Sequence, residues 1–319
     1  MTSAVGVRIG WRDLPPKIRS AIEEILGSPV VEAVSQPGGF SPGTADRVRT
    51  VAGTRAFVKA VSVVQNPHSV ELHRREAAIT ARLPAQAAAP ALLGSYDDGE
   101  WVALVLEDVP GRHPHTPWVA DELAAILASL RDLATRLTPS PVPDVPLAAE
   151  VLRHDFGGWG RIAANPPNDL SPWAAEHLDQ LCALADRART VVHGDTLVHL
   201  DVRADNILVR PDGGVTLVDW PWACAGAPWL DTLMLMINVR LFGGHPTDQL
   251  LAAHTPGADP RDLTAVLAAM AGFYLDAARR PDPPGLPTLR EFQRAQGTAA
   301  LAWVRERLTA ASDRRGQTG

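Results

Sequence analysis

The sequence predicts an α+β protein with two lobes: a small N-terminal lobe built on an antiparallel sheet with one helix, and a larger, mostly helical C-terminal lobe. Residues 30–108 contain five short runs typical of β-strands, with one helical segment after the third run. Most connections between these runs are too short for crossovers, so antiparallel pairing is favoured. After Gly111, apolar residues recur at helical spacing instead. We therefore expect the lobes at residues 1–108 and 109–319.

Turns, prolines and apolar spacing place the elements of the N-terminal lobe. A short amphipathic helix is expected at the start, because Pro15 and Pro16 precede isoleucines that share one face. Hairpin turns are expected at residues 52–54 and 97–99. The strands are expected at residues 30–34, 46–51, 55–61, 91–96 and 101–106, and the helices at residues 15–26 and 68–83.

The C-terminal lobe is predicted to hold one small β-hairpin among helices. Two short β-like runs, residues 207–209 and 215–218, are joined by a turn at residues 211–214. The polar tail, residues 311–319, is expected to fray. The helices are expected at residues 117–137, 172–188, 229–242, 247–254, 261–279 and 289–310.

Composition excludes several classes of protein. The 319 residues, 46% of them hydrophobic, are ample for a buried core. A net charge of −6 argues against a generic nucleic-acid binder. The two cysteines, Cys182 and Cys224, exclude a disulfide framework and a four-cysteine zinc site. We found neither a signal peptide nor an apolar run long enough for a membrane span, so a cytoplasmic protein without a membrane partner is expected.

Three oxygen-bearing side chains around the predicted hairpin suggest a site. Asp201 and Asn206 lie five residues apart in one loop, and Asp219 follows at the end of the second strand. The hairpin folds back and would bring Asp219 next to the loop. Two of these side chains, together with phosphate oxygens, suit Mg²⁺. The remaining carboxylate is free to accept a proton from an attacking hydroxyl group.

This segment resembles the catalytic loop of the eukaryotic-like kinase superfamily, H-R-D-x-x-x-x-N followed by a metal-binding Asp. His199 and Asp201 match the first part of that pattern, and Asn206 has the same interval. The Asp219-Trp220 pair and the following segment 226–231 make the chain similar to the aminoglycoside phosphotransferase family of kinase-like small-molecule phosphotransferases. The resemblance covers about residues 30–280 and implies a bilobal protein-kinase-like fold.

The resemblance also implies a role for each matching residue. Asp201 would be the base or the carboxylate that orients the hydroxyl group, and Asn206 and Asp219 would ligate Mg²⁺. Arg203 would lie near the transferred phosphate. His199 would hold the loop, and Asp231 would brace it from the following helix. These residues are His199, Asp201, Arg203, Asn206, Asp219 and Asp231.

A second His-x-Asp sequence lies just upstream. His193-Gly194-Asp195 also looks like the motif of this family. Five residues after Asp195, however, stands Leu200, which cannot bind a metal ion. The copy with Asn206 in place is therefore favoured.

A kinase also needs a lysine on the third strand of its small lobe and a glutamate on the next helix. Of the 30 basic residues, only Lys17 and Lys59 are lysines. Lys59 lies in the third expected strand, and Glu76 lies in the helix that follows. The pair would neutralise the nucleotide phosphates. On their own, Glu76 fits a solvated helix face and Lys59 a surface strand.

Two backbone segments complete the expected nucleotide site. Glycines such as Gly39 in the segment 38–43 let the backbone approach phosphate, and Ser41 adds a hydroxyl donor. By resemblance, the interlobe hinge would use the Glu107 carbonyl and the Val109 N–H to read the adenine edge. ATP is the default nucleotide.

The sequence therefore predicts a kinase that uses ATP and Mg²⁺ to phosphorylate a hydroxyl group of a small molecule. Only eleven residues separate Asp219 from Asp231, too few for the peptide platform of a protein kinase. The acceptor is either an aminoglycoside or other antibiotic, with a role in resistance, or a choline- or homoserine-like metabolite. The acidic excess either serves a cationic acceptor or is routine. The further alternative is a catalytically inactive nucleotide-binding regulator, and the oligomeric state stays open.

Overall fold

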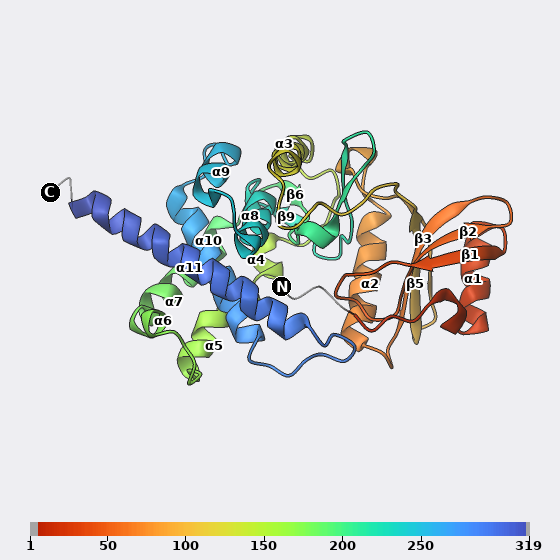
Figure 1. Ribbon diagram of the computed structural model, residues 1–319, viewed down its shortest axis with the longest axis horizontal. Helices are drawn as coiled ribbons and strands as arrows, with labels where there is room; N and C mark the ends of the chain where they lie inside the picture. Colours follow the sequence, from red (N-terminus) through yellow and green to blue (C-terminus); the bar gives the residue numbers. More distant parts are fainter. Residues whose placement is uncertain (1–5, 317–319) are drawn as a thin grey trace.

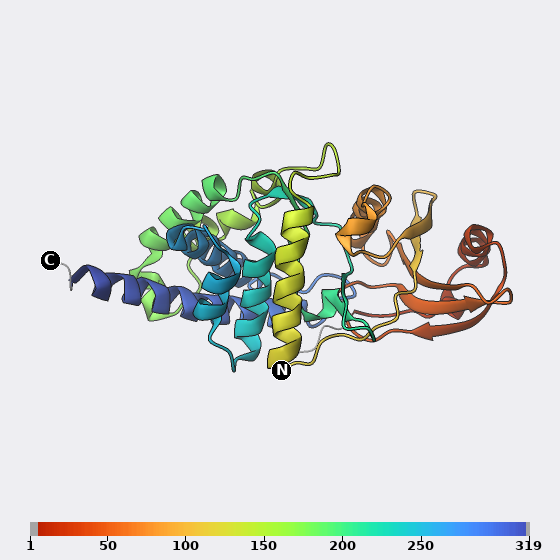
Figure 2. The same cartoon turned by 90° about the horizontal axis from the view of Figure 1, so that it is seen from above.

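The structure is a computed structural model that describes residues 6–316. A five-stranded sheet with two helices forms one end of the molecule, and the other end is mostly helical (Figures 1 and 2). The α+β architecture expected from the sequence is confirmed. No helix among the described residues is long and apolar enough to cross a membrane.

The large sheet is antiparallel throughout, with strand order β1-β2-β3-β5-β4. All five expected strands are present, and their ends differ from the expectation by at most a few residues. β3 is the central strand, so Lys59 lies in the middle of the sheet and not at an edge. The strands are β1 (Val30–Ser35), β2 (Thr44–Thr50), β3 (Arg55–Ser62), β4 (Leu92–Asp97) and β5 (Trp101–Glu107).

Helices cover both faces of this sheet. α1 (Pro16–Leu26) buries Ile18 and Ile22 against the face that carries Val58. α2 (Pro67–Thr80) packs through Val70 on the opposite face. Side chains alternate between the two faces of a strand. Lys59, which follows Val58, therefore points to the α2 side.

The helical lobe is organised around α10, most of whose side chains are buried. α7, α11 and α5 pack against it. The helices are α3 (Ala120–Arg136), α4 (Ala148–Val151), α5 (Gly158–Ala164), α6 (Pro172–Glu176), α7 (Leu178–Val191), α8 (Leu230–Phe242), α9 (Thr247–His254), α10 (Pro260–Ala277) and α11 (Leu289–Gly316). Two small antiparallel sheets pair β6 (Thr196–Val198) with β9 (Cys224–Gly226), and β7 (Ile207–Val209) with β8 (Val215–Leu217).

Four details of this lobe differ from the sequence-based expectation. The sheet of β6 and β9 was not predicted, since only one small β-hairpin was expected. The expected helix at 172–188 is divided into α6 and α7, and the short helices α4 and α5 were not predicted. The fraying expected from residue 311 is wrong up to residue 316, because α11 continues to Gly316. Ala and Arg, which are frequent in that segment, are good helix formers. Residues 317–319 lie outside the described part of the chain.

The segment between α10 and α11 connects the two lobes. It reaches from the helical lobe to the start of α2 (Figure 1). The Asn66 side chain donates to the Pro284 carbonyl at 2.8 Å, and the Val7 N–H donates to the Gly285 carbonyl at 2.8 Å. The ring of Phe40, at the tip of the glycine-rich segment, lies 4.9 Å from that of Phe292 on α11. These contacts hold the glycine-rich segment over the catalytic loop.

Candidate active site

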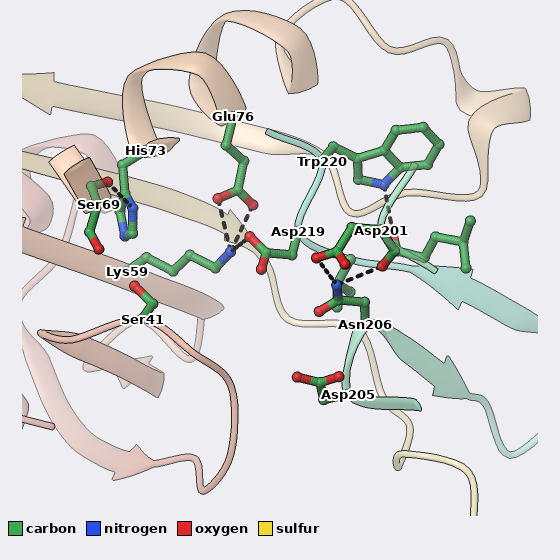
Figure 3. A network of polar contacts seen from close by, with 12 residues as sticks. Ser41, Lys59, Ser69, His73, Glu76, Asp201, Asp205, Asn206, Asp219 and Trp220 are labelled. Atoms are coloured by element: carbon green, nitrogen blue, oxygen red, sulfur yellow. Dashed lines mark hydrogen bonds and ion pairs between the residues drawn. The ribbon is translucent and has the colours of Figure 1, made fainter. Parts of the chain in front are cut away.

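Lys59 is held by two carboxylates from distant parts of the chain (Figure 3). Its Nζ donates to Glu76 Oε1 at 2.8 Å and Oε2 at 2.9 Å, and to Asp219 Oδ1 at 2.9 Å. Glu76 comes from the α2 face of the sheet, and Asp219 follows β8. The expected Lys59–Glu76 pair is thus present, and the lysine side chain is fixed toward Asp219.

A buried carboxylate at the start of α8 fixes the loop that carries Asp201. Asp231, in the first turn of α8, accepts from the N–H groups of His199 at 2.9 Å and Leu200 at 2.8 Å. Leu200 has φ 69°, a left-handed conformation that a leucine adopts only at a cost of about 1–2 kcal/mol. The two hydrogen bonds that Asp231 accepts stabilise this strained turn, which positions Asp201.

His199 is buried and acts as a spacer between the loop and β8. Its Nδ1 accepts from the Asp201 N–H at 3.2 Å, which leaves Nε2 to donate to the Val218 carbonyl at 2.9 Å. Burial lowers the pKa of His199, in keeping with a neutral ring. Trp220 meets the ring edge-on at 4.7 Å. His199 therefore contacts the backbone at Asp201 and the residue before Asp219.

Arg203 joins two acidic side chains at the cavity. Its Nη1 donates to Asp201 at 2.8 and 2.9 Å, and its Nε donates to Asp205 at 2.7 Å. The guanidinium also lies 5.4 Å from the centre of the Phe40 ring. Arg203 thus connects the catalytic loop to the glycine-rich segment. Asp205 was not singled out in the sequence, because nothing in the motif distinguished it from an ordinary loop carboxylate.

The β7–β8 hairpin brings Asn206 and Asp219 together, as expected. The Val218 N–H donates to the Asn206 carbonyl at 3.0 Å. The Asn206 Nδ2 donates to the Asp201 carbonyl at 2.9 Å and to Asp201 Oδ2 at 3.0 Å. The amide oxygen therefore lies on the side away from Asp201 (Figure 3). Asp219 has φ 69°, a second non-glycine residue in the left-handed region.

Burial and neighbouring charges separate the two aspartates in acidity. Burial, opposed by Arg203, raises the pKa of Asp201 to about 6, a value suited to a group that exchanges a proton near neutral pH. Burial alone would also raise the pKa of Asp219, but the charge and hydrogen bond of Lys59 lower it well below its usual range. Burial would lower the pKa of Lys59, but Asp219 and Glu76 raise it. Asp219 is therefore a permanent anion.

Two cavities meet at this network. The first lies under the glycine-rich segment and is lined by all of the residues expected to bind the nucleotide and magnesium, namely Gly39, Ser41, Lys59, Glu76, Glu107, Val109, Asn206 and Asp219. The second is wider, about 620 Å³, and is lined by Asp201, Arg203 and the helices around them. Phe40, Ser41, Glu76 and Asp219 line both. A phosphate bound in the first cavity would face an acceptor in the second across Asp219.

Arg8 is a cavity residue that sequence reasoning missed. It reaches the first cavity because the segment around it pairs with Gly43, and its Nη2 donates to the Gly38 carbonyl at 2.7 Å. Its Nε is buried without a hydrogen-bond partner. Burial lowers the pKa of Arg8, against the charges of Asp219 and Asp46. No motif accompanies Arg8, and only the fold places it in the same cavity as Lys59.

The alternative motif at residues 193–195 lies away from both cavities. His193, Gly194 and Asp195 are exposed. The Asp195 carbonyl accepts from the Ser140 N–H at 2.6 Å. None of the three residues lines either cavity.

Asn206 and Asp219 are the expected ligands of a magnesium ion. Among the described residues, no group of three or more His, Cys, Asp or Glu side chains could hold a metal ion. Asn206 and Asp219 present an amide oxygen and an ionised carboxylate, and Asp219 is 37% exposed toward the cavities. Mg²⁺ is typically bound by one or two carboxylates and substrate phosphates. The residues therefore fit a magnesium ion that arrives with a nucleotide.

Comparison with known sequences agrees with this geometry. The model of the phosphotransferase enzyme family matches residues 39–267, which include Lys59, Glu76, Asp201 and Asp219. The chain belongs to the phosphotransferase enzyme family. The expectation of a small-molecule kinase is confirmed at that level. No curated protein matches the chain significantly.

Solved structures with the same fold are distant in sequence. An aminoglycoside phosphotransferase from Alicyclobacillus acidocaldarius is 16% identical, with a TM-score of 0.53, over 93% of this chain and 97% of that chain. The choline kinase LicA from Streptococcus pneumoniae is 13% identical, with a TM-score of 0.61, over 92% and 98%. A thermostable mutant of aminoglycoside phosphotransferase APH(4)-Ia, crystallised with AMP-PNP and hygromycin B, is 15% identical, with a TM-score of 0.60, over 93% and 97%. These likenesses establish the kinase-like fold.

Proposed function

We propose that this phosphotransferase moves the γ-phosphate of ATP to a hydroxyl group of a small molecule, with residues 1–108 as the nucleotide-binding lobe and residues 109–319 as the catalytic and acceptor-binding lobe. The observation that carries the proposal is the junction of the two cavities. There, Lys59 contacts Asp219, and Asn206 contacts Asp201, within one continuous polar network. An inactive regulator would not need Asp201 beside the second cavity.

The first cavity would hold the nucleotide. The Glu107 carbonyl and the Val109 N–H would contact the adenine edge. The backbone at Gly39 and the hydroxyl group of Ser41 would contact the phosphates. Gly39 has φ 78°, a conformation that favours glycine, so the segment can turn closely over a phosphate. Lys59 would offset phosphate charge, with Glu76 holding its orientation.

Asn206 and Asp219 would hold Mg²⁺ together with the phosphates. When bound, the ion would neutralise charge on the phosphate oxygens. Asp219 stays ionised because Lys59 lies beside it, and the hydrogen bonds from Asn206 Nδ2 to Asp201 leave the amide oxygen free to bind the ion. Both residues thus have a fixed protonation state and orientation before the nucleotide arrives.

Asp201 would orient the acceptor hydroxyl group and take its proton. A bond forms between the hydroxyl oxygen and the γ-phosphorus, and the bond from that phosphorus to the β–γ bridging oxygen breaks. The products are a phosphate monoester and ADP, and the proton passes to Asp201. Arg203 lies against Asp201 and would face the transferred phosphate. His199 and Asp231 would keep the loop in place. Most of the rate enhancement comes from positioning and electrostatics.

The solved structures with the same fold support this proposal, but they do not identify the acceptor. One was crystallised with AMP-PNP and hygromycin B, and another is a choline kinase. Antibiotic and metabolite acceptors are both consistent with that group. A role in antibiotic resistance would follow only from an antibiotic acceptor.

The proposal is tested by nucleotide turnover with a panel of hydroxylated acceptors, with and without Mg²⁺. We expect ADP and a phosphorylated acceptor in equal amounts, and loss of both after magnesium is chelated. Asp201→Ala should lower kcat about 10²–10⁴-fold, because a positioned base contributes that much. Nucleotide binding should be unchanged in the variant. Bound nucleotide with no transfer to any acceptor would instead favour a regulator.

A further inference from the structure

The second cavity has both apolar and polar walls. Large apolar side chains from the glycine-rich segment, α2, α10, α11 and the segment after β8 line part of it. These include Phe40, Leu72, Trp222, Met270, Phe273 and Phe292. Apolar lining side chains are typical of sites that bury most of a ligand. The acceptor should therefore present an apolar body to these walls.

The carboxylates of this cavity are almost all engaged elsewhere. Glu76 and Asp219 are bound to Lys59, and Asp201 is bound to Arg203. Among the described lining residues, this leaves Asp155. Its Oδ1 lies 3.4 Å from His154 Nδ1, and burial raises the pKa of Asp155. One weakly acidic carboxyl group is a poor match for an acceptor with several ammonium groups.

Guanidinium groups, by contrast, are abundant on the walls. Arg290, at the start of α11, donates to the Pro281 carbonyl at 3.1 Å and to Gln293 Oε1 at 2.8 Å, both neutral partners. Its neighbour Arg280 pairs with Asp276 at 2.7 Å. Burial lowers the pKa of Arg290, and the charge of Arg280 lowers it further. The charge of Asp282 opposes this lowering, but among the described residues no carboxylate forms an ion pair with Arg290.

Asp276 does not neutralise all of the guanidinium charge around Arg280. The same carboxylate also accepts hydrogen bonds from Arg161 and Arg279, so three guanidinium groups share one negative charge. On the α2 side, Arg75 stacks 4.9 Å from the centre of a Trp222 ring and has no ion pair among the described residues. The walls formed by α2 and by residues 280–290 therefore present guanidinium groups to the cavity, although the chain has a net charge of −6.

We infer that the acceptor is an alcohol with an apolar body and an anionic group, either a carboxylate or a phosphate ester, which Arg290 binds beside Arg280. Arg75, on the opposite wall, adds a field of the same sign. Guanidinium groups pair well with both kinds of anion. A polycationic acceptor would meet the guanidinium groups of Arg75, Arg280 and Arg290 on these walls, and is disfavoured there. This inference rests on the proposed phosphotransfer.

The test uses alcohols that share one scaffold and differ only in charge. Suitable probes are 4-(3-hydroxypropyl)benzoate, its methyl ester, 4-(3-hydroxypropyl)phenyl phosphate and 4-(3-hydroxypropyl)benzylamine, with hygromycin B as the polycation. We measure kcat/KM by ADP release and phosphorylated product, and binding by calorimetry with a non-hydrolysable ATP analogue present. The wild-type protein should bind and turn over an anionic probe at least about tenfold better than the ester or the amine. The two anionic probes show which group is preferred.

Arg290→Gln should remove that preference. It should lower affinity and kcat/KM for the anionic probe about tenfold and leave the ester unchanged, because only the anion loses a charged partner. Arg153→Gln is the matched control, since Arg153 is exposed beside the cavity without lining it. Thermal unfolding shows whether each variant folds.

The outcomes separate this inference from the proposed function. Transfer that prefers the ester, the amine or hygromycin B, or an anion preference that survives in Arg290→Gln, overturns the anionic acceptor and leaves phosphotransfer intact. Analogue-dependent binding of the anionic probe without any transfer overturns the proposed function and supports the subsite. Absence of both binding and transfer with the anionic probes, while another probe binds, also overturns the inference.

Discussion

The two cavities that meet at Asp219 are built in different ways. The first is lined largely by a β-sheet, the glycine-rich segment and the β7–β8 hairpin, and nearly all of its lining lies within residues 39–267, the part that matches the family. The second is walled by helices, and its lining residues from Met270 to Gln296 lie beyond that match. The family match thus includes nearly all of the first cavity and only part of the second.

The two cavities also differ in how their charged side chains are paired. In the first, most of the charged side chains form ion pairs, for example Lys59 with Glu76 and Asp219, and Arg47 with Asp108. In the second, Arg75 and Arg290 face the cavity without carboxylate partners among the described residues. The first cavity is preorganised by its own side chains, whereas the second is left with charge for a ligand to satisfy. Substitutions on the two sides should therefore have separable effects.

Apart from Asp201→Ala, the largest effect is expected from Lys59→Met, on the nucleotide side. Loss of this cation should lower kcat/KM about 10²–10³-fold, the usual cost of removing one electrostatic contact in an active site. Nucleotide affinity should fall as well, and calorimetry should find acceptor binding unchanged. Lys17→Met is the matched control, because Lys17 is the other lysine and forms an exposed ion pair with Asp98. Equal losses in the two variants would contradict the proposed site.

Asp276→Asn, on the acceptor side, should lower the stability of the protein. Asp276 is buried, and its loss would leave three guanidinium groups without their shared anion, so the free energy of unfolding should fall by about 3 kcal/mol. Its hydrogen bonds with these arginines outweigh burial and lower the pKa of Asp276. The stabilisation is therefore complete above the unfolded pKa of about 4 and is lost as pH falls through the folded pKa.

Thermal unfolding from pH 7 downward measures this effect. The difference between wild type and Asp276→Asn should shrink below about pH 4. Asp132→Asn, which removes one partner of an exposed ion pair, should change stability by less than about 0.5 kcal/mol. A difference for Asp276→Asn that is independent of pH would show that the arginine cluster does not need the ionised carboxylate.

The smallest effect is expected from Arg8→Gln, which tests whether the N-terminal segment belongs to the nucleotide side. We expect KM for ATP to rise about fivefold with kcat nearly unchanged, because one charge-assisted contact to phosphate is lost. The acceptor KM should not move. Arg12→Gln, an exposed arginine of the same segment, is the control. An unchanged KM for ATP in Arg8→Gln would remove Arg8 from the nucleotide site.

Much of the site could be predicted because its parts lie in short, regular segments. The spacing of Asp201, Asn206 and Asp219 already implied a hairpin that folds back, and β7–β8 has that register. The alternation of side chains along β3 already directed Lys59 to one face, and α2 covers that face. Asp205 and Arg8 could not be found in this way, since neither stands at a distinctive interval.

The sequence by itself determined the two-lobed architecture, the five-stranded sheet and the set of residues around the hairpin, because local periodicity and short intervals along the chain are sufficient for these. Only the tertiary structure decided where Arg8, Arg75 and Arg290 come to lie, and which carboxylates remain free to meet a ligand. An ion pair depends on distance in space and on burial. No pattern in the sequence predicts that residues more than two hundred positions apart will line the same cavity.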